Sequence, residues 1–143
     1  MFKTSFRCWF LKIIRGRVLV EGYAEGEALV SKEPISFLGD IDPKTGIIVR
    51  KDHPLRGLSI KDKVFVFPYG KGSTVGSYII YQLAKNNVAP KAILNVKSEP
   101  IIIIGCVISE IPLMDSFKEN ILKIVKNGDY IVVNGREGHI IVK

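Results

Sequence analysis

The chain has 143 residues, of which 47% are hydrophobic and 24% are charged, and these values predict one soluble folded domain. No apolar run approaches the length of a transmembrane helix, and Lys12 interrupts the apolar residues near the N-terminus, so we expect no membrane partner, no signal peptide and a cytoplasmic location. The formal net charge is +7, and residues 1–17 carry five basic residues and no acidic one. We expect a basic extension at residues 1–14 ahead of a domain at residues 15–143. Basic and aromatic residues do not interleave as on an RNA-binding sheet, so we expect no nucleic-acid partner.

The predicted strands and helices alternate along the chain and indicate an α/β domain with mixed strands. In chain order they are strands over residues 13–21 and 27–31 joined through Gly22 and Gly26, a long irregular connection over 33–57, a strand over 64–67, a helix over 75–85, a strand over 92–96, an undecided segment over 101–110, a helix over 117–126 behind the capping box at 116–119, and a hairpin of strands over 130–133 and 139–142. The undecided segment, Ile101 to Glu110, is β-branched like a strand, but Ser98, Glu99 and Pro100 precede it as at a helix start. Periodicity leaves both interpretations open.

The most informative stretch is Gly70-Lys-Gly-Ser-Thr-Val-Gly76, between the predicted strand at 64–67 and the helix that follows. A strand, a glycine-dense turn and a helix N-terminus in that order favour anion binding. The spacing excludes a P-loop, a dinucleotide-binding fingerprint and a hydrolase nucleophile elbow. Ser73 stands where the helix begins, so its hydroxyl either caps the helix or faces a bound ligand. The loop alone leaves both interpretations open.

Several short motifs accompany this loop in a fixed order. They are Asp42-Pro-Lys-Thr-Gly46, His53-Pro54, Gly57, Pro68, Gly70–Ser77, Ala89-Pro-Lys-Ala-Ile93 and Glu99-Pro100. The whole set resembles the swivel domain of the aconitase X family, from about Gly16 to the terminal hairpin. It departs at Phe37-Leu-Gly39, where the family more often has two consecutive glycines. The resemblance implies a swivelling β/β/α fold, as in the small domain of aconitase-like enzymes, that docks on a larger subunit.

The resemblance also implies an activity, a partner and a role for Ser73. The chain would be the small subunit of a heterodimeric hydro-lyase (dehydratase), inactive without a large subunit that carries a 4Fe-4S cluster. Free-standing chains of this kind belong to the mevalonate pathway, and their small phosphorylated hydroxy-acid substrate, (R)-5-phosphomevalonate, loses water to give trans-anhydromevalonate 5-phosphate. Fused relatives act on hydroxyproline-type substrates, which is an alternative. Ser73 is the implied proton acceptor. Cys8 and Cys106 are far apart in sequence and form no CxxC pair, so we expect no cofactor on this chain alone.

The sequence also suggests groups that assist the serine. The candidate substrate-binding residues are Gly70, Lys71, Gly72, Thr74, Asp42 and Thr45. The helix N-terminus and the amides beside Gly70 and Gly72 would favour an ionised hydroxyl. Lys71 either adds charge or points to solvent, and Asp42–Gly46 is either an ordinary turn or a wall of the pocket near Ser73. Two other functions stay open on the residues alone: a stand-alone anion- or nucleotide-binding module, and a basic RNA-associated protein.

Overall fold

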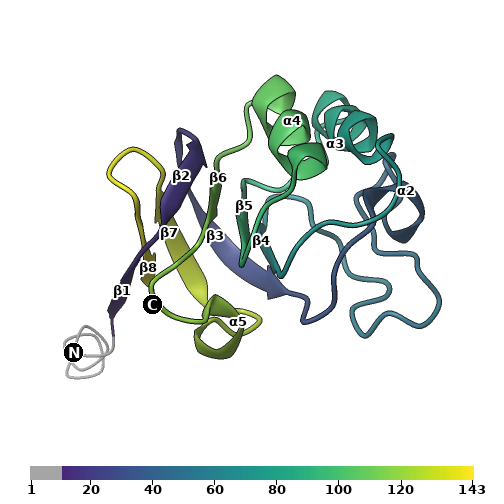
Figure 1. Ribbon diagram of the computed structural model, residues 1–143. Coiled ribbons are helices and arrows are strands. Elements are labelled where there is room, and N and C mark those ends of the chain that lie inside the picture. The colour runs from purple at the N-terminus through teal and green to yellow at the C-terminus, as the bar shows by residue number, and fades with distance from the viewer. Residues whose placement is uncertain (1–10) are drawn as a thin grey trace.

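The computed structural model describes residues 11–143, which form one mixed sheet with helices packed against it (Figure 1). The strands are β1 (Lys12–Arg15), β2 (Arg17–Val20), β3 (Tyr23–Val30), β4 (Val64–Phe67), β5 (Ala92–Asn95), β6 (Leu113–Asp115), β7 (Tyr130–Asn134) and β8 (His139–Val142). The helices are α2 (Phe37–Asp40), α3 (Gly76–Lys85), α4 (Pro100–Ser109) and α5 (Ile121–Ile124). The predicted extension at residues 1–14 therefore contributes its last residues to β1, and its residues 1–10 lie outside the described part of the chain.

The sheet curls into a barrel-like shape. Its strand order is β1-β8-β7-β3-β4-β5-β6-β2, with β3 to β6 parallel and the remaining neighbours antiparallel. The two ends of this order, β1 and β2, are separated in sequence by Gly16 alone. A Cβ atom on Gly16 would lie 2.6 Å from the ring of Phe117, so only glycine fits where the chain crosses from one end of the sheet to the other.

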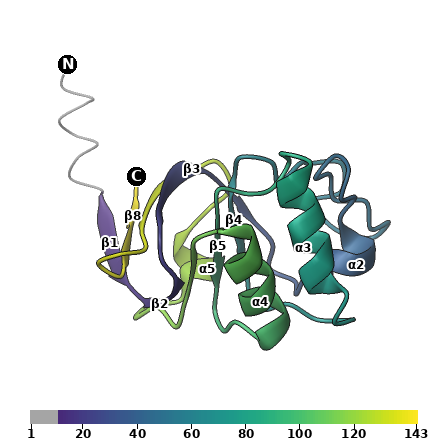
Figure 2. The same cartoon turned by 90° about the horizontal axis from the view of Figure 1, so that it is seen from above.

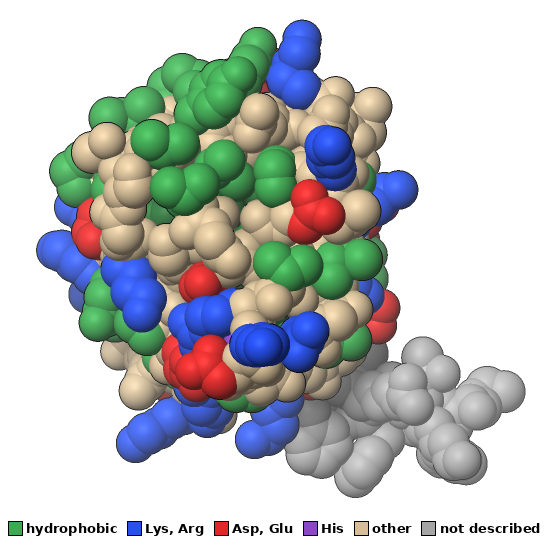
Figure 3. Space-filling view, turned by 90° about the vertical axis from the view of Figure 1, so that its right-hand side faces the viewer, with side chains coloured by type: hydrophobic (Ala, Val, Ile, Leu, Met, Phe, Trp, Pro, Cys, Tyr) green, Lys and Arg blue, Asp and Glu red, His purple; other side chains and the backbone are tan. Residues whose placement is uncertain are grey.

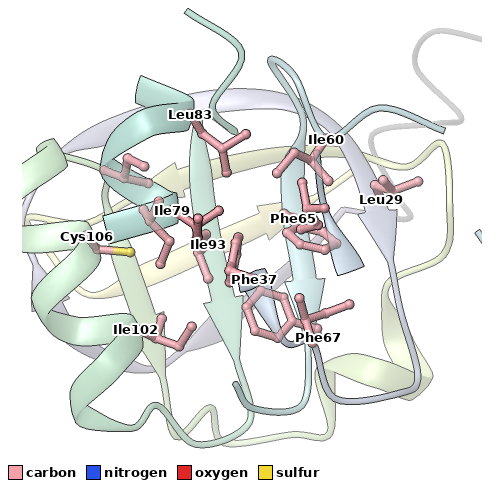
Figure 4. Packing of buried hydrophobic residues seen from close by; sticks show 14 of the residues in the cluster. Leu29, Phe37, Ile60, Phe65, Phe67, Ile79, Leu83, Ile93, Ile102 and Cys106 are labelled. Carbon is pink, nitrogen blue, oxygen red and sulfur yellow. The ribbon is translucent and has the colours of Figure 1, made fainter. Parts of the chain in front are cut away.

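Two hydrophobic cores lie on opposite faces of this sheet. Because side chains alternate along a strand, β4 sends Val64 and Val66 into the barrel interior and Phe65 and Phe67 towards the helices. In the outer core the rings of Phe65 and Phe67 lie 6.3 and 5.9 Å from that of Phe37, while α3 and α4 cover them side by side (Figures 2 and 4). Both helices follow parallel strands, so both begin at the carboxyl edge of the sheet.

Most of the predicted elements are confirmed, including the α/β class, the interior strand at 64–67, the helix after Ser73 and the terminal hairpin. The undecided segment is the helix α4, ended by Glu110 in the left-handed conformation. The predicted connection through Gly26 is wrong, because Gly26 pairs with Ile131 inside β3 and the turn lies at Gly22. A Cβ on Gly26 would approach the carbonyl of Asp62 to 3.1 Å, which explains a glycine within a strand.

The predicted helix over 117–126 is also wrong in extent, because α5 spans only Ile121–Ile124. The expected capping box does not form. The amide of Lys118 instead donates to the carbonyl of Arg15 at 2.9 Å, and Ser116 takes a positive φ of 52°. The helix begins later, at Asn120, whose side-chain oxygen accepts from the amide of Leu122 at 3.0 Å. Contacts with β1 therefore override the local capping signal.

Candidate active site

The loop between β4 and α3 is held beside the segment at Ile35. The amide of Ile35 donates to the carbonyl of Tyr69 at 3.2 Å, and the amide of Lys71 donates back to the carbonyl of Ile35 at 2.9 Å. This parallel bridge extends β4 beyond Pro68, so the glycine-rich stretch leaves the carboxyl edge of the sheet in a fixed direction. The start of α3 is thereby placed at the surface, at the edge where the parallel strands end.

Two glycines allow this loop to pack closely against its neighbours. A Cβ on Gly70 would lie 2.6 Å from the side chain of Ile102 in α4. Gly72 has a φ of +93°, and a Cβ there would collide with the hydroxyl of Ser36. The backbone amides at positions 72, 73 and 74 make no hydrogen bond to any residue in the range 11–143. The loop therefore presents a short row of free N–H donors next to a helix N-terminus, as an anion requires.

Ser73 is exposed in the turn that leads into α3. Its Oγ accepts a hydrogen bond from the amide of Val75 at 3.1 Å, and its carbonyl accepts from the amide of Gly76 at 2.9 Å. The predicted capping is therefore found only in this turn, because Val75 occupies the N-cap position of α3 and makes no side-chain cap bond. The bond to the Ser73 hydroxyl does not exclude a chemical role. An amide that donates to Oγ stabilises the ionised hydroxyl more than the neutral one, and the dipole of the ten-residue helix acts in the same direction.

The other predicted site residues fall into two groups. Lys71 and Thr74 are exposed beside Ser73, and Lys71 forms no ion pair with residues 11–143, so its ammonium group points to solvent. Asp42 and Thr45 lie elsewhere. Thr45 donates to the Asp42 carboxylate at 3.1 Å within their own turn, and that turn accepts a bond from Asn86 at the far end of α3. A helix of that length spans about 15 Å, so the structure does not bring this turn to Ser73.

A buried polar network that the sequence analysis missed supports this edge of the sheet. The carboxylate of Asp115, which is fully buried, receives two hydrogen bonds of 2.9 Å from Arg17 and one of 2.8 Å from the amide of Ser98. The hydroxyl of Ser98 donates to Asn95 at 2.9 Å, and the Asn95 amide donates to the carbonyl of Phe67 at 3.0 Å. Burial alone would raise the pKa of Asp115, but the bonds from Arg17 and Ser98 outweigh it and lower that pKa. The network fixes the start of α4 against the ends of β4 and β5.

His53 has a structural role in this chain. Its ring is buried, with Nδ1 accepting from the amide of Leu55 at 2.9 Å and Nε2 lying 3.1 Å from the hydroxyl of Ser31. Burial and the neighbouring Arg50 lower the pKa of His53, so the ring is neutral and donates through Nε2. It borders a surface cavity of about 380 Å³ between the end of β3 and α5. Both ring nitrogens are occupied, so His53 is not a free base.

Two properties of the described chain concern cofactors and membranes. Among residues 11–143, no three His, Cys, Asp or Glu side chains are grouped so as to hold a metal ion. Cys106 is buried in the outer core, and burial raises the pKa of its thiol. No helix in the same range is long and apolar enough to span a membrane.

A family model of the aconitase X swivel domain matches residues 13–142, which run from β1 to β8. The chain belongs to this family. A relative of this swivel domain from Methanosarcina acetivorans, named phosphomevalonate dehydratase small subunit, is 57% identical over 127 residues, covering 89% of this chain and 88% of the relative. A relative of the same name from Methanosarcina mazei is 56% identical over 126 residues, covering 88% of each chain.

The fold of this aconitase X swivel domain also matches a solved structure. The crystal structure of Thermococcus kodakaraensis aconitase X in its holo-form superposes with a TM-score of 0.88 at 45% identity, covering 92% of this chain and 98% of that chain. The predicted swivel fold and family are thus confirmed. The resemblance rested on short motifs in order, and the match extends over nearly the whole described chain.

Proposed function

We propose that this aconitase X swivel domain is the small subunit of a phosphomevalonate dehydratase. Such an enzyme removes water from (R)-5-phosphomevalonate to give trans-anhydromevalonate 5-phosphate, as a hydro-lyase of the mevalonate pathway. Support comes from relatives of that name at up to 57% identity over most of both chains. The observation that carries the proposal is Ser73, exposed at the start of α3 on a loop whose neighbouring amides are free. The proposed enzyme acts in the cytoplasm.

Ser73 is proposed to act as the proton acceptor. A proton leaves the carbon next to the carboxylate for Oγ of Ser73, the electrons of that C–H bond form the double bond, and hydroxide leaves the neighbouring carbon. A serine oxygen is a weak base unless it is ionised. The bond of 3.1 Å from the Val75 amide and the positive end of α3 both stabilise the alkoxide.

The loop is proposed to bind an anionic group of the substrate. Its free amides at positions 72–74 are suited to carboxylate or phosphate oxygens, and Lys71 adds an exposed positive charge nearby. Gly70 and Gly72 let the loop pack closely against Ile102 and Ser36, and Thr74 supplies a further exposed hydroxyl. We leave Asp42 and Thr45 out of the substrate contacts, because their turn packs at the other end of α3.

The described residues do not fit an iron–sulfur cluster, which requires several thiolates. Cys106 is buried, and no group of metal-ligating side chains occurs among residues 11–143. We therefore propose that a 4Fe-4S cluster and the groups that assist departure of the hydroxyl belong to a large subunit. This chain would form a heterodimer with that subunit and would be inactive alone. The role of this chain in the heterodimer would be to hold the Ser73 hydroxyl, the proposed base, next to the substrate.

The decisive experiment is anaerobic co-expression with a candidate large subunit, followed by an assay for dehydration of phosphomevalonate. Wild type should turn over, and Ser73→Ala should lose at least about a thousandfold in kcat while still assembling. The matched control is Ser77→Ala, which removes a hydroxyl from the first turn of the same helix but one that donates to the carbonyl of Ile101 at 2.6 Å. Near-normal turnover by Ser73→Ala would eliminate the assigned role.

One alternative keeps the same loop but changes the function. The free amides at positions 72–74 also suit a stand-alone module that binds anions or nucleotides. Titration calorimetry of the isolated chain with nucleotides and with inorganic phosphate separates the two. Tight binding by the isolated chain, with no large subunit retained on co-expression, would favour the module.

A further inference from the structure

Helix α4 is apolar on every side, including the side that faces solvent. Its ten residues, Pro100–Ser109, include no charged side chain. Ile102 and Cys106 are buried against the sheet, but Ile104, Val107 and Ile108 are 53%, 54% and 52% exposed. A surface helix normally places polar residues on its outer side, and a helix that is hydrophobic all round is normally buried. Within residues 11–143 nothing covers this side of α4.

Helix α3 lies beside α4 and adds an exposed aromatic side chain (Figure 2). The hydroxyl of Ser77 donates to the carbonyl of Ile101 at 2.6 Å, so the first turns of the two helices touch. On α3, Tyr78 is 58% exposed and its ring lies 6.5 Å from that of Tyr81. We call the surface made by Ile104, Val107, Ile108 and Tyr78 the docking face. In Figure 3 hydrophobic side chains gather over the upper part of the molecule, where α3 and α4 lie in Figure 1, and charged side chains gather below.

We propose that the docking face is where the large subunit binds, an inference that rests on the proposed function. Ser73 lies in the loop just ahead of α3. A partner that brings substrate to Ser73 would therefore contact the first turns of α3 and α4. Tyr78, in the first turn of α3, is the member of the docking face nearest Ser73 in the chain, and Ile104, Val107 and Ile108 follow in later turns of α4. The centres of protein interfaces are depleted of charged residues, as α4 is. A second copy of this chain on the same face would stand in the way of that partner.

The test places a charge at the centre of the docking face. Ile104→Glu should leave the fold intact, because the side chain is half exposed and glutamate is a good helix former. In the complex it would bury an unpaired carboxylate, so affinity for the large subunit should fall at least about tenfold, measured by co-purification and by titration with the separately expressed partner. The matched control is Ile13→Glu, which is 63% exposed on β1, on the opposite side of the molecule from α4 (Figure 1).

The possible outcomes distinguish a failure of the docking inference from a failure of the proposed function. If wild type and Ile104→Glu bind the large subunit equally, the docking inference is wrong and the proposed function stands. If sedimentation shows a wild-type dimer that Ile104→Glu dissociates, without weakening the large-subunit complex, the face pairs two copies and the inference is again wrong. If wild type retains no large subunit, the proposed function fails first. Should Ile104→Glu unfold, the uncharged pair Ile104→Gln with Ile108→Gln makes the same test.

Discussion

Arg17 and Asp115 form an ion pair of unequal burial, which makes the effect of removing one partner predictable. The carboxylate of Asp115 is fully buried, whereas the Arg17 side chain is 49% exposed. Arg17→Met deletes both 2.9 Å bonds and leaves a buried carboxylate with the amide of Ser98 as its main donor. Removing one partner of a buried ion pair costs about 3–5 kcal/mol, and the exposure of Arg17 favours the lower end, so we expect a loss of about 3 kcal/mol in unfolding free energy near neutral pH.

The stability difference between wild type and Arg17→Met should change with pH, and the pKa of Asp115 sets the direction of that change. The pKa of Asp115 is lowered in the folded wild type, so its contribution is present above the unfolded pKa and is lost as the pH falls through the folded value. In Arg17→Met burial raises that pKa, so the variant loses stability as the pH rises. The difference between wild type and variant should therefore be largest near neutral pH and small in acid.

Urea unfolding followed by circular dichroism, at neutral pH and at acid pH, measures this difference. The double variant Arg17→Met with Asp115→Asn removes the stranded charge, and it should recover part of the loss at neutral pH. A destabilisation by Arg17→Met that is the same at both pH values would refute the argument. So would a double variant whose loss equals the sum of the two single losses.

Three further predictions follow from other sites. Gly70→Ala should destabilise the chain by about 1–3 kcal/mol, since its Cβ would lie 2.6 Å from Ile102; an unchanged midpoint in thermal unfolding would contradict this. Ser73→Ala should cost about 1 kcal/mol in the isolated chain, because the bond to the Val75 amide is lost, as urea unfolding can check. Cys106 should react with a thiol reagent only after unfolding, because it is buried and burial raises its pKa; fast labelling of the folded chain would count against the core placement.

The central part of the fold was predictable because its signals are local. The apolar run Val64–Phe67, the proline after it and the glycine-rich turn each act within a few residues, and they gave β4, the loop and α3. Segment 101–110 resisted prediction because its outer side is as apolar as its inner side, so no helical period stands out. The feature that made α4 ambiguous in sequence is thus the same one that makes it a docking candidate.

The candidate site was predictable only where one short segment carries it. Ser73, Lys71 and Thr74 lie together because they are neighbours in the chain. The network around Asp115 was invisible, since Arg17 is 98 residues away in sequence and only the pairing of β2 with β6 brings the two together. For the turn at Asp42, the motif order suggested a closeness to Ser73 that the structure does not have. The turn belongs to the same ordered set of motifs as Ser73, but α3 separates it from that serine in space.

The pairing of β1 with β8 has a consequence for how the chain folds. Lys12 lies opposite Val142, so the first described strand finds its partner almost at the end of the chain. The barrel cannot be completed until the last strand has left the ribosome, and its closure depends on a contact that spans nearly the whole sequence. Folding dominated by such distant contacts is slow. During synthesis β1 therefore waits unpaired, and a chain that stops before β8 would expose an open sheet edge to other growing chains.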